Sequence, residues 1–219
     1  MENSAKEQTN NLSLKGEFYR KTIHLFSSAI PIGYYFIPKN IVLSIVIPLL
    51  FLMLLVEAVK YKNDFIYGLY LRFFKSMLRG HETDRRKIRI NGASWLLAAD
   101  VLCIIIFPKY IAITGMLLLS FSDSLSGIFG RLYGKKQYAP NRSYVGTFTF
   151  FLVSVLIVFL TPKYQYLPVE YYLALFAVLL TTIVDSMNLP IDDNFAIPLV
   201  YSGLLYVLYL IFLPSIFIT

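Results

Sequence analysis

The sequence predicts an all-α integral membrane protein, a bundle of about seven transmembrane helices with one interfacial amphipathic helix. Of its 219 residues, 57% are hydrophobic and only 15% are charged, whereas about a quarter of the residues in a soluble domain are charged. Several stretches approach the roughly 20 apolar residues that a spanning helix needs. Basic residues gather between these stretches, where membrane proteins place them to set their orientation.

The candidate spans follow one another along almost the whole chain, and several prolines fall at or between their ends, as expected of residues that break helices. The spans are Phe18–Phe36, Ile41–Val59, Gly92–Phe107, Tyr110–Gly130, Val145–Leu160, Val169–Met187 and Phe195–Phe217. Residues 1–16 are polar, and we expect a flexible cytoplasmic tail rather than a cleavable signal peptide. Residues 17–219 then form a single transmembrane domain. The aromatic and basic stretch Tyr61–Arg79 is expected to lie as an amphipathic helix in the cytoplasmic interface.

The positions of the basic residues predict the orientation. If the N-terminus is cytoplasmic, 17 of the 20 Lys and Arg residues lie inside, and the outer loops hold only Lys39, Lys109 and Lys163. This asymmetry places the C-terminus outside. It also accounts for the net charge of +7, so we expect contact with anionic lipid headgroups rather than with nucleic acid. The membrane would be the cell inner membrane in a bacterium, or the endoplasmic reticulum or a plastid in a eukaryote. The sequence does not encode the oligomeric state.

Ionisable side chains within spans are costly and are candidates for function. The spans contain His24, Glu57, Asp100, Asp123 and Asp185. Glu57 is expected at a solvated helix terminus. Asp100 lies about 13 Å along its helix from Asn91, where a structural partner and a functional role are equally plausible. The same two alternatives stand for Asp185.

Two polar stripes recur at helical spacing. In the first span, Glu17, Arg20, His24, Ser27 and Pro31 share one face of an otherwise apolar segment. In the fourth span, Ser120, Asp123, Gly127, Gly130 and Gly134 follow the same pattern, and Lys135 and Lys136 come next. An acid, glycines and lysines suit a metal-bound polyphosphate, since the carboxylate holds the metal, small residues allow close approach and lysines neutralise phosphate. The alternative is helix packing around a buried acid.

The loop after the sixth span carries three consecutive oxygen-bearing side chains, those of Asp192, Asp193 and Asn194. With the orientation above, they face the cytoplasm, where the lysines lie. This cluster could hold a metal ion, or it could be a solvated turn in which Asn194 caps the following helix.

Four segments, in this order, resemble the polyprenol kinase family, which includes dolichol kinase, phytol kinase and the fungal CTP-dependent diacylglycerol kinase. They are RKTIHLFSS (Arg20–Ser28), SDSLSGIFGRLYGKK (Ser122–Lys136), SYVGT (Ser143–Thr147) and DSMNLPIDDNFAIP (Asp185–Pro198). The resemblance implies a membrane enzyme that transfers the terminal phosphoryl of a nucleoside triphosphate, often CTP, to the hydroxyl of a long-chain alcohol, with Mg²⁺ as the divalent metal. Acceptors would be phytol, farnesol, geranylgeraniol, a longer polyprenol or diacylglycerol.

The resemblance, together with the charges nearby, predicts the site residues. Asp123, His24 and Asp193 are the catalytic candidates, with His24 or an acid accepting the hydroxyl proton. The metal candidates are Asp123, Asp192, Asp193 and Asp185, although the family has a glutamate where Asp185 is expected to match. Nucleotide and phosphate contacts are expected from Arg20, Lys21, Gly127, Gly130, Arg131, Gly134, Lys135, Ser143, Gly146 and Asn194.

Two other functions compete with a kinase. A cytidylyltransferase that forms CDP-lipids is related, but its signature of a lysine–aspartate pair followed by histidine and glycines is not found in this sequence. A non-catalytic membrane carrier would also have intramembrane acids, yet transporters usually show repeated halves, and no internal repeat is evident.

Overall fold

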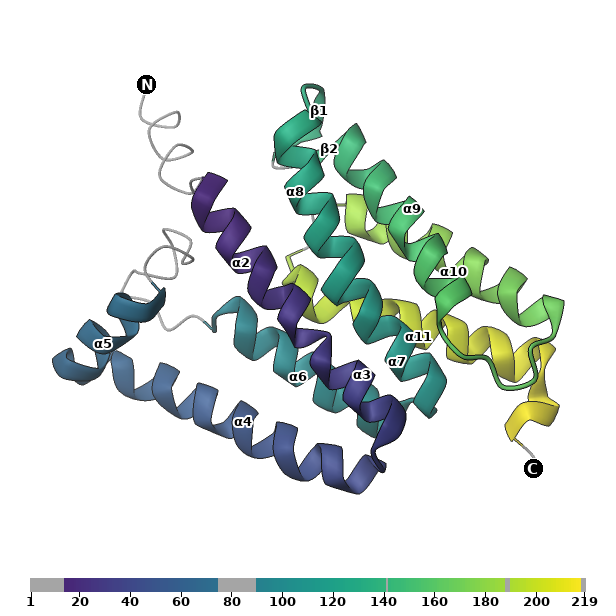
Figure 1. Cartoon of the computed structure of the whole chain (residues 1–219), viewed down its shortest axis with the longest axis horizontal. Coiled ribbons are helices and arrows are strands. Elements are labelled where there is room, and N and C mark those ends of the chain that lie inside the picture. The colour runs from purple at the N-terminus through teal and green to yellow at the C-terminus, as the bar shows by residue number, and fades with distance from the viewer. Residues whose placement is uncertain (1–13, 75–89, 141, 188–189, 218–219) are drawn as a thin grey trace.

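The computed structural model describes residues 14–74, 90–140, 142–187 and 190–217, and these residues are almost entirely helical (Figure 1). Within this part of the chain, 4 helices are long and apolar enough to cross a membrane: Lys39–Lys60, Lys109–Tyr133, Pro168–Ser186 and Asp193–Phe212. Gly92–Ile106 and Tyr144–Leu160 are apolar but shorter. The prediction of an all-α protein with helices long and apolar enough to span a membrane is therefore confirmed, while the number of seven spans stays a prediction.

The elements follow the predicted order. They are α2 (Leu14–Ser27), α3 (Ala29–Phe36), α4 (Lys39–Lys60), α5 (Asp64–Phe74), α6 (Gly92–Ile106), α7 (Lys109–Leu117), the π-helical segment η2 (Leu118–Asp123), α8 (Ser124–Tyr133), β1 (Gln137–Ala139), β2 (Arg142–Ser143), α9 (Tyr144–Leu160), α10 (Pro168–Ser186), α11 (Asp193–Phe212) and the 3₁₀ turn η3 (Pro214–Phe217). Helix α5 falls within the predicted interfacial segment, whose residues 75–79 lie outside the described residues. The expected tail, residues 1–16, also lies largely outside the described residues. Helix α2 begins at Leu14, two residues before the predicted end of that tail.

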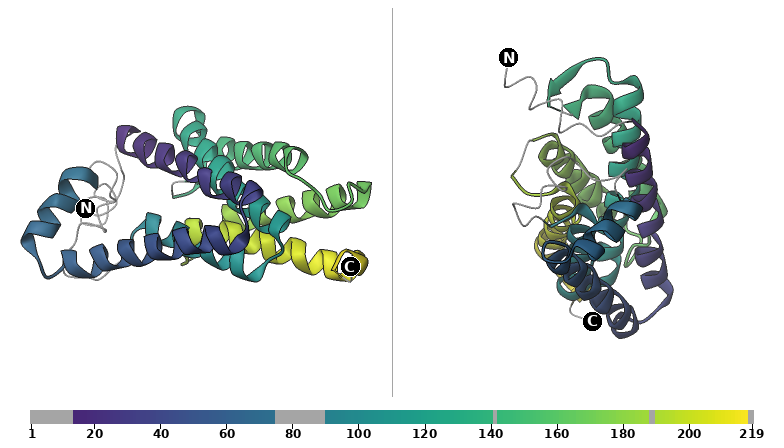
Figure 2. Two further views of the ribbon diagram at one scale, coloured as in Figure 1. Left: turned by 60° about the horizontal axis from the view of Figure 1, so that its bottom comes forward. Right: turned by 90° about the vertical axis from the view of Figure 1, so that its left-hand side faces the viewer.

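The helices pack in two layers, which the left view of Figure 2 separates clearly. Helices α2, α8 and α9 lie side by side in one layer, and α4, α6 and α11 form the other. Helix α7 reaches α11, and α10 contacts both α9 and α11, so these two helices join the layers. The core between them is apolar, with Ile104, Leu118 and Phe150 fully buried.

The first predicted span is divided into two helices, which corrects the expectation of one continuous helix. The break falls at Ser28, between α2 and α3. The hydroxyls of Ser27 and Ser28 donate to the carbonyls of His24 and Leu25, each three residues earlier. Such bonds compete with the helical ladder and bend helices. Pro31, in the next turn, has no N–H to bond to the Ser27 carbonyl.

The fourth predicted span is continuous from Lys109 to Tyr133, but its middle turn is π-helical. This segment covers Leu118–Asp123 and ends at the aspartate that the sequence singles out. A π-helical turn adds a residue to the turn and is found frequently at functional sites. The seventh predicted span ends at Phe212 rather than Phe217, because Pro214 cannot continue the helix and starts a 3₁₀ turn.

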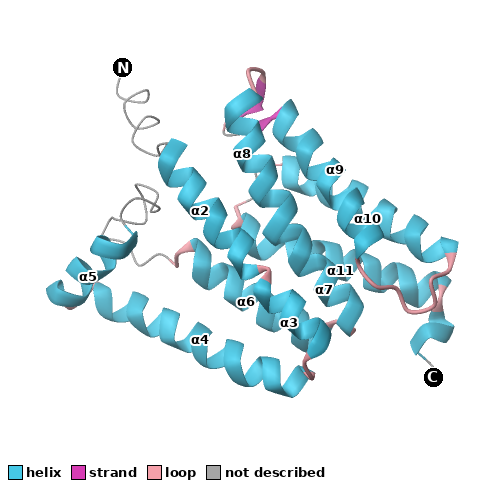
Figure 3. Cartoon of the chain, viewed as in Figure 1, coloured by secondary structure: helices cyan, strands magenta, loops and turns pink. Residues whose placement is uncertain are grey.

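A short β-hairpin, absent from the predictions, joins α8 to α9 (Figure 3). Its strands pair antiparallel, with Gln137 opposite Ser143 and Ala139 opposite Arg142. The side chain of Ser143 accepts a hydrogen bond from the Gly146 N–H and so caps α9 at its N-terminus. The hairpin thus fixes Arg142 and Ser143 directly beside the ends of the helices.

Glu170, at the opposite end of α10 from Asp185, organises the loop that enters the helix. Its carboxylate is fully buried and accepts the backbone N–H groups of Tyr164, Gln165 and Leu167. The hydroxyl of Tyr209 on α11 also donates to it, at 3.3 Å. One side chain therefore satisfies the loop backbone and joins it to a neighbouring helix.

We predict that Glu170→Ala lowers the free energy of unfolding by about 2–4 kcal/mol, because three partly buried N–H groups and the Tyr209 hydroxyl lose their acceptor. Thermal unfolding of the detergent-solubilised protein measures the change. Tyr172→Ala is the control, since that side chain is 70% exposed. Equal unfolding temperatures for the Glu170 and Tyr172 variants would contradict this role.

Candidate functional site

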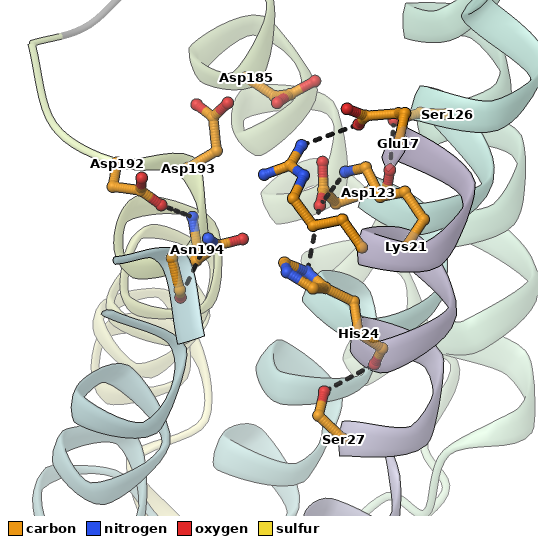
Figure 4. A network of polar contacts seen from close by, with 12 residues as sticks. Glu17, Lys21, His24, Ser27, Asp123, Ser126, Asp185, Asp192, Asp193 and Asn194 are labelled. Carbon is orange, nitrogen blue, oxygen red and sulfur yellow. Dashed lines mark hydrogen bonds and ion pairs between the residues drawn. The ribbon is translucent and has the colours of Figure 1, made fainter. Parts of the chain in front are cut away.

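The predicted polar residues gather where α2, the end of η2, the end of α10 and the start of α11 approach one another (Figure 4). Asp123 closes η2, Asp185 lies one residue before the end of α10, and Asp192 and Asp193 begin α11. Residues far apart in the sequence therefore reach the same end of the bundle, as the sequence predicted for the acids.

The centre of the site is an ion pair between α2 and the end of η2. Lys21 Nζ lies 2.5 Å from Asp123 Oδ2, and both residues are buried. His24, one turn further along α2, places Nδ1 3.8 Å from the same oxygen, and this nitrogen forms no hydrogen bond with any described residue. Figure 4 shows both side chains pointing toward the carboxylate.

A second group of charges flanks this ion pair. One carboxylate oxygen of Glu17, on α2, accepts a hydrogen bond from Arg20 Nη2 at 2.8 Å. Its other oxygen lies 3.4 Å from Arg131 Nη2 on α8. Glu17 thereby orients two of the arginines that we expected to contact phosphate.

Arg142 joins the two remaining acids, and sequence reasoning did not select it. Its Nη1 donates to Asp185 Oδ1 at 2.7 Å, and its Nη2 donates to Asp193 Oδ1 at 2.9 Å. Burial favours the neutral guanidinium, but the two carboxylates outweigh it and raise the pKa of Arg142 above its usual value. The side chain therefore remains charged. The only signal in the sequence for a role of Arg142 was its position directly before Ser143. The β-hairpin that positions its side chain could not be predicted.

The glycines of the fourth span allow close packing against α2 and α9. A Cβ at Gly127 would lie 2.5 Å from Lys21 Cε, so a side chain there would push Lys21 away from Asp123. A Cβ at Gly130 would lie 3.2 Å from the Cα of Gly146, where α8 and α9 nearly touch. Gly134 similarly faces the Ser143 side chain. These glycines set helix spacing, which also fits the packing alternative for the stripe.

The turn before α11 is built by hydrogen bonds. Asp192, not Asn194, is the N-cap, and its side chain accepts the N–H of Asn194 at 3.0 Å. This finding corrects the expectation that Asn194 would be the cap if the turn were structural. Asn194 is instead buried and donates through Nδ2 to the Gly92 carbonyl at 3.1 Å. It connects the start of α11 to the start of α6.

Not every candidate reaches the centre. Lys135 is exposed in the turn between α8 and β1. Asp100 is buried within α6, as its position in the span predicted. Glu57 corrects the expectation of a solvated terminus, because it is 5% exposed and accepts hydrogen bonds from Asn91 N and Ser94 Oγ. It holds the start of α6 against the end of α4.

The carboxylates suit Mg²⁺ in chemistry, since this ion prefers oxygen ligands. Within the described residues, however, no group of three or more His, Cys, Asp or Glu side chains is arranged to hold a metal ion. Asp123 faces Lys21, while Asp185 and Asp193 face Arg142. Mg²⁺ commonly uses only one or two carboxylates together with substrate phosphates and waters. One or two of these carboxylates would therefore be enough for an ion whose other ligands are phosphates and waters.

Comparison with known proteins identifies two relatives. The chain is 27% identical over 184 residues to an uncharacterized protein of Rickettsia prowazekii (strain Madrid E), covering 83% of this chain and 89% of that protein. It is 26% identical over 186 residues to CTP-dependent diacylglycerol kinase 1 of Saccharomyces cerevisiae, covering 75% of this chain and 62% of the yeast protein. No family model matches the chain, and no solved structure matches it. The chain is thus distantly similar to a lipid kinase.

We predict that Arg142→Gln lowers the free energy of unfolding by about 1–3 kcal/mol, because it leaves the carboxylate of Asp185 buried without a countercharge. Chemical denaturation in detergent measures the change. Lys136→Gln, in the exposed turn nearby, removes the same net charge and serves as the control. A loss of similar size in both variants would show that net charge, rather than the bridge, sets the stability.

Proposed function

We propose that this protein is a membrane lipid-alcohol kinase that transfers the terminal phosphoryl group of a nucleoside triphosphate, CTP in the first instance, to a lipid hydroxyl. The observation that carries the proposal is the junction of Lys21, His24 and Asp123 between α2 and η2, with Arg142 and two further acids opposite. Similarity to a CTP-dependent diacylglycerol kinase supports the reaction class and the donor. The acceptor is a prenyl alcohol such as phytol, farnesol, geranylgeraniol or a polyprenol, or else diacylglycerol.

The buried cations are suited to phosphate. Phosphoryl transfer is accelerated mainly by positioning and by neutralisation of charge. Lys21, Arg20 and Arg142 present positive charge from α2 and from the hairpin, and acidic side chains hold each in place. Arg131 extends this positive surface along α8, and Lys135 lies where the nucleotide approaches from water.

In the reaction, the alcohol oxygen forms a bond to the γ-phosphorus, and the bond from that phosphorus to the β–γ bridging oxygen breaks. The nucleoside diphosphate leaves, and the hydroxyl proton passes to the enzyme. His24 Nδ1 is the proposed acceptor of this proton, because it is buried, it has no hydrogen-bond partner among the described residues and it faces Asp123. Asp123 then stabilises the charge that forms on the imidazole.

Mg²⁺ would neutralise the triphosphate when bound, and Asp123, Asp193, Asp192 and Asp185 are the residues proposed to hold it. Two of these carboxylates are bridged by Arg142 and one is paired with Lys21. Lys21 and Arg142 would then turn to the phosphates, because lysine and a bidentate arginine bind phosphate as they bind carboxylate.

We further propose a multi-pass protein of seven spans, with its N-terminus and the site on the cytoplasmic side and its C-terminus outside. Helix α2–α3 and the shorter α6 and α9 supply the spans beyond the four long helices. Helix α5 lies in the cytoplasmic interface. In this orientation the nucleotide comes from water and the acceptor from lipid, and the two meet at the membrane boundary.

We predict that Asp123→Asn lowers kinase turnover by about 100-fold or more, since it removes a charge proposed to act on both the metal and His24. The assay follows transfer from γ-labelled CTP to a mixture of prenyl alcohols and diacylglycerol by the purified protein. Asp64→Asn, an exposed acid on α5, is the control.

The Asp123→Asn substitution leaves Lys21 buried without its carboxylate partner and could unfold the protein. The double variant Asp123→Asn/Lys21→Gln removes both charges and so tests whether a loss of activity reflects unfolding. We expect this neutral pair to be as helical and as monodisperse as the wild type, and equally inactive. Turnover near the wild-type rate in a folded variant would rule out the proposed role of Asp123.

We also predict that EDTA abolishes phosphoryl transfer and that added Mg²⁺ restores it, whereas the unfolding temperature in the absence of nucleotide changes little. The reason is that the metal is expected to bind with the nucleotide rather than to support the fold. Full turnover in EDTA would contradict the metal requirement.

A further inference from the structure

Two irregular segments of backbone lie side by side at the same level of the bundle. Helix α2 ends at Ser27 and α3 begins at Ala29, while η2 is π-helical from Leu118 to Asp123. The two segments are in contact through α2 and η2. Irregular backbone at membrane depth is tolerated where it is enclosed by protein or lines a cavity. The π-helical segment ends at Asp123 of the ion pair, and the break at Ser28 lies about two helical turns beyond Lys21.

A pair of hydroxyls connects these segments. Ser27 Oγ and Ser120 Oγ are 3.2 Å apart, and Ser27 also donates to the His24 carbonyl. Ser120 is 2% exposed, whereas Ser27 is only half-buried. Ser27 therefore links the closed interior to the outer surface of α2. The outer surface there is apolar, because Ile23, one turn before Ser27 on the same side, is 42% exposed.

The adjacent imidazole provides an independent sign of a ligand. His24 is 3% exposed, and its Nδ1 forms no hydrogen bond with any described residue although it faces the site. A buried ring nitrogen without a partner is costly, so a bound polar group is expected beside it. An alcohol hydroxyl is suitable, since it can donate to the ring nitrogen and accept from Ser120 once that hydroxyl turns away from Ser27. The proton of Ser27 is already donated to the His24 carbonyl.

We propose that Ser27 and Ser120 form the acceptor subsite, which holds the hydroxyl of the lipid alcohol against His24 while its apolar tail stays in the bilayer beside α2. This inference rests on the proposed function for its chemistry, and it adds where the acceptor binds and which side chains receive it. The ligand class is an uncharged alcohol with one long apolar tail, or diacylglycerol, which shares the hydroxyl.

The first test uses steady-state kinetics to distinguish an effect on binding of the alcohol from an effect on binding of CTP. In Ser27→Ala and Ser120→Ala, we expect the KM for the alcohol in mixed micelles to rise about 3–10-fold, the value of one neutral hydrogen bond. The KM for CTP should change less than twofold. Ser27→Thr, which keeps the hydroxyl, should remain close to the wild type. An unchanged KM for the alcohol, or an equal rise for CTP, would overturn the subsite.

Ser44→Ala is a matched control, because Ser44 also donates to a carbonyl three residues earlier, that of Ile41, but is remote on α4. Ser28→Ala removes the equivalent bond to Leu25 directly next to Ser27. Neither variant should raise the KM for the alcohol. A rise in both controls would mean that bending of the helix, rather than the Ser27 hydroxyl, changes the activity.

The second test needs no catalysis and therefore separates failure of the subsite from failure of the kinase proposal. Geranylgeraniol carrying a diazirine close to its hydroxyl is cross-linked to the protein in nanodiscs without nucleotide. We expect labelling within residues 23–31 or 117–123, which unlabelled geranylgeraniol or dioleoylglycerol prevents and an alkane of equal length does not. Labelling should fall at least threefold in Ser27→Ala/Ser120→Ala. Labelling elsewhere, or labelling insensitive to both alcohols and to the double substitution, would refute the inference.

Discussion

The buried ion pair between Lys21 and Asp123 is the interaction on which the site depends. It joins α2 to the end of η2 across 102 residues of sequence. Neither charge could be buried alone, since an unpaired ion inside a protein or a bilayer is very costly. The pair therefore determines how α2 meets α8, and Gly127 leaves the space in which Lys21 reaches the carboxylate. That placement of α2 also brings His24 close to Asp123 and Glu17 close to Arg131.

The opposite side of the site repeats this arrangement with different partners. Arg142 neutralises Asp185 and Asp193, as Lys21 neutralises Asp123. Each of these acids thus has a cationic partner, although the single guanidinium of Arg142 is shared between two carboxylates. Under the proposed function, the phosphates of a metal–nucleotide complex would replace the carboxylates as partners of Lys21 and Arg142, and the metal would replace these cations as partner of the carboxylates.

Much of the helical fold could be predicted from apolar runs, and the Asp123–Gly134 stripe could be predicted from spacing of three and four. The hydrogen bonds at Ser27 and Ser28 are local, but their effect depends on Pro31, and the polar stripe around them runs through both helices without marking the break. Arg142 was missed because its two partners are 43 and 51 residues away. Glu57 was misjudged because its partners, Asn91 and Ser94, belong to a different helix. Pairings over such distances depend on tertiary packing.

The π-helical turn explains how one long helix serves two neighbours. Before it, Gly115 on α7 faces α11 so closely that a Cβ would lie 2.9 Å from the Pro198 carbonyl oxygen. After it, Gly130 on α8 faces Gly146 on α9. A regular helix with constant rotation per residue keeps one face along its length, whereas a wider turn shifts the register of everything that follows. The shift falls between these two contacts and ends at Asp123, so the rotation that redirects the glycine face also turns the carboxylate toward Lys21.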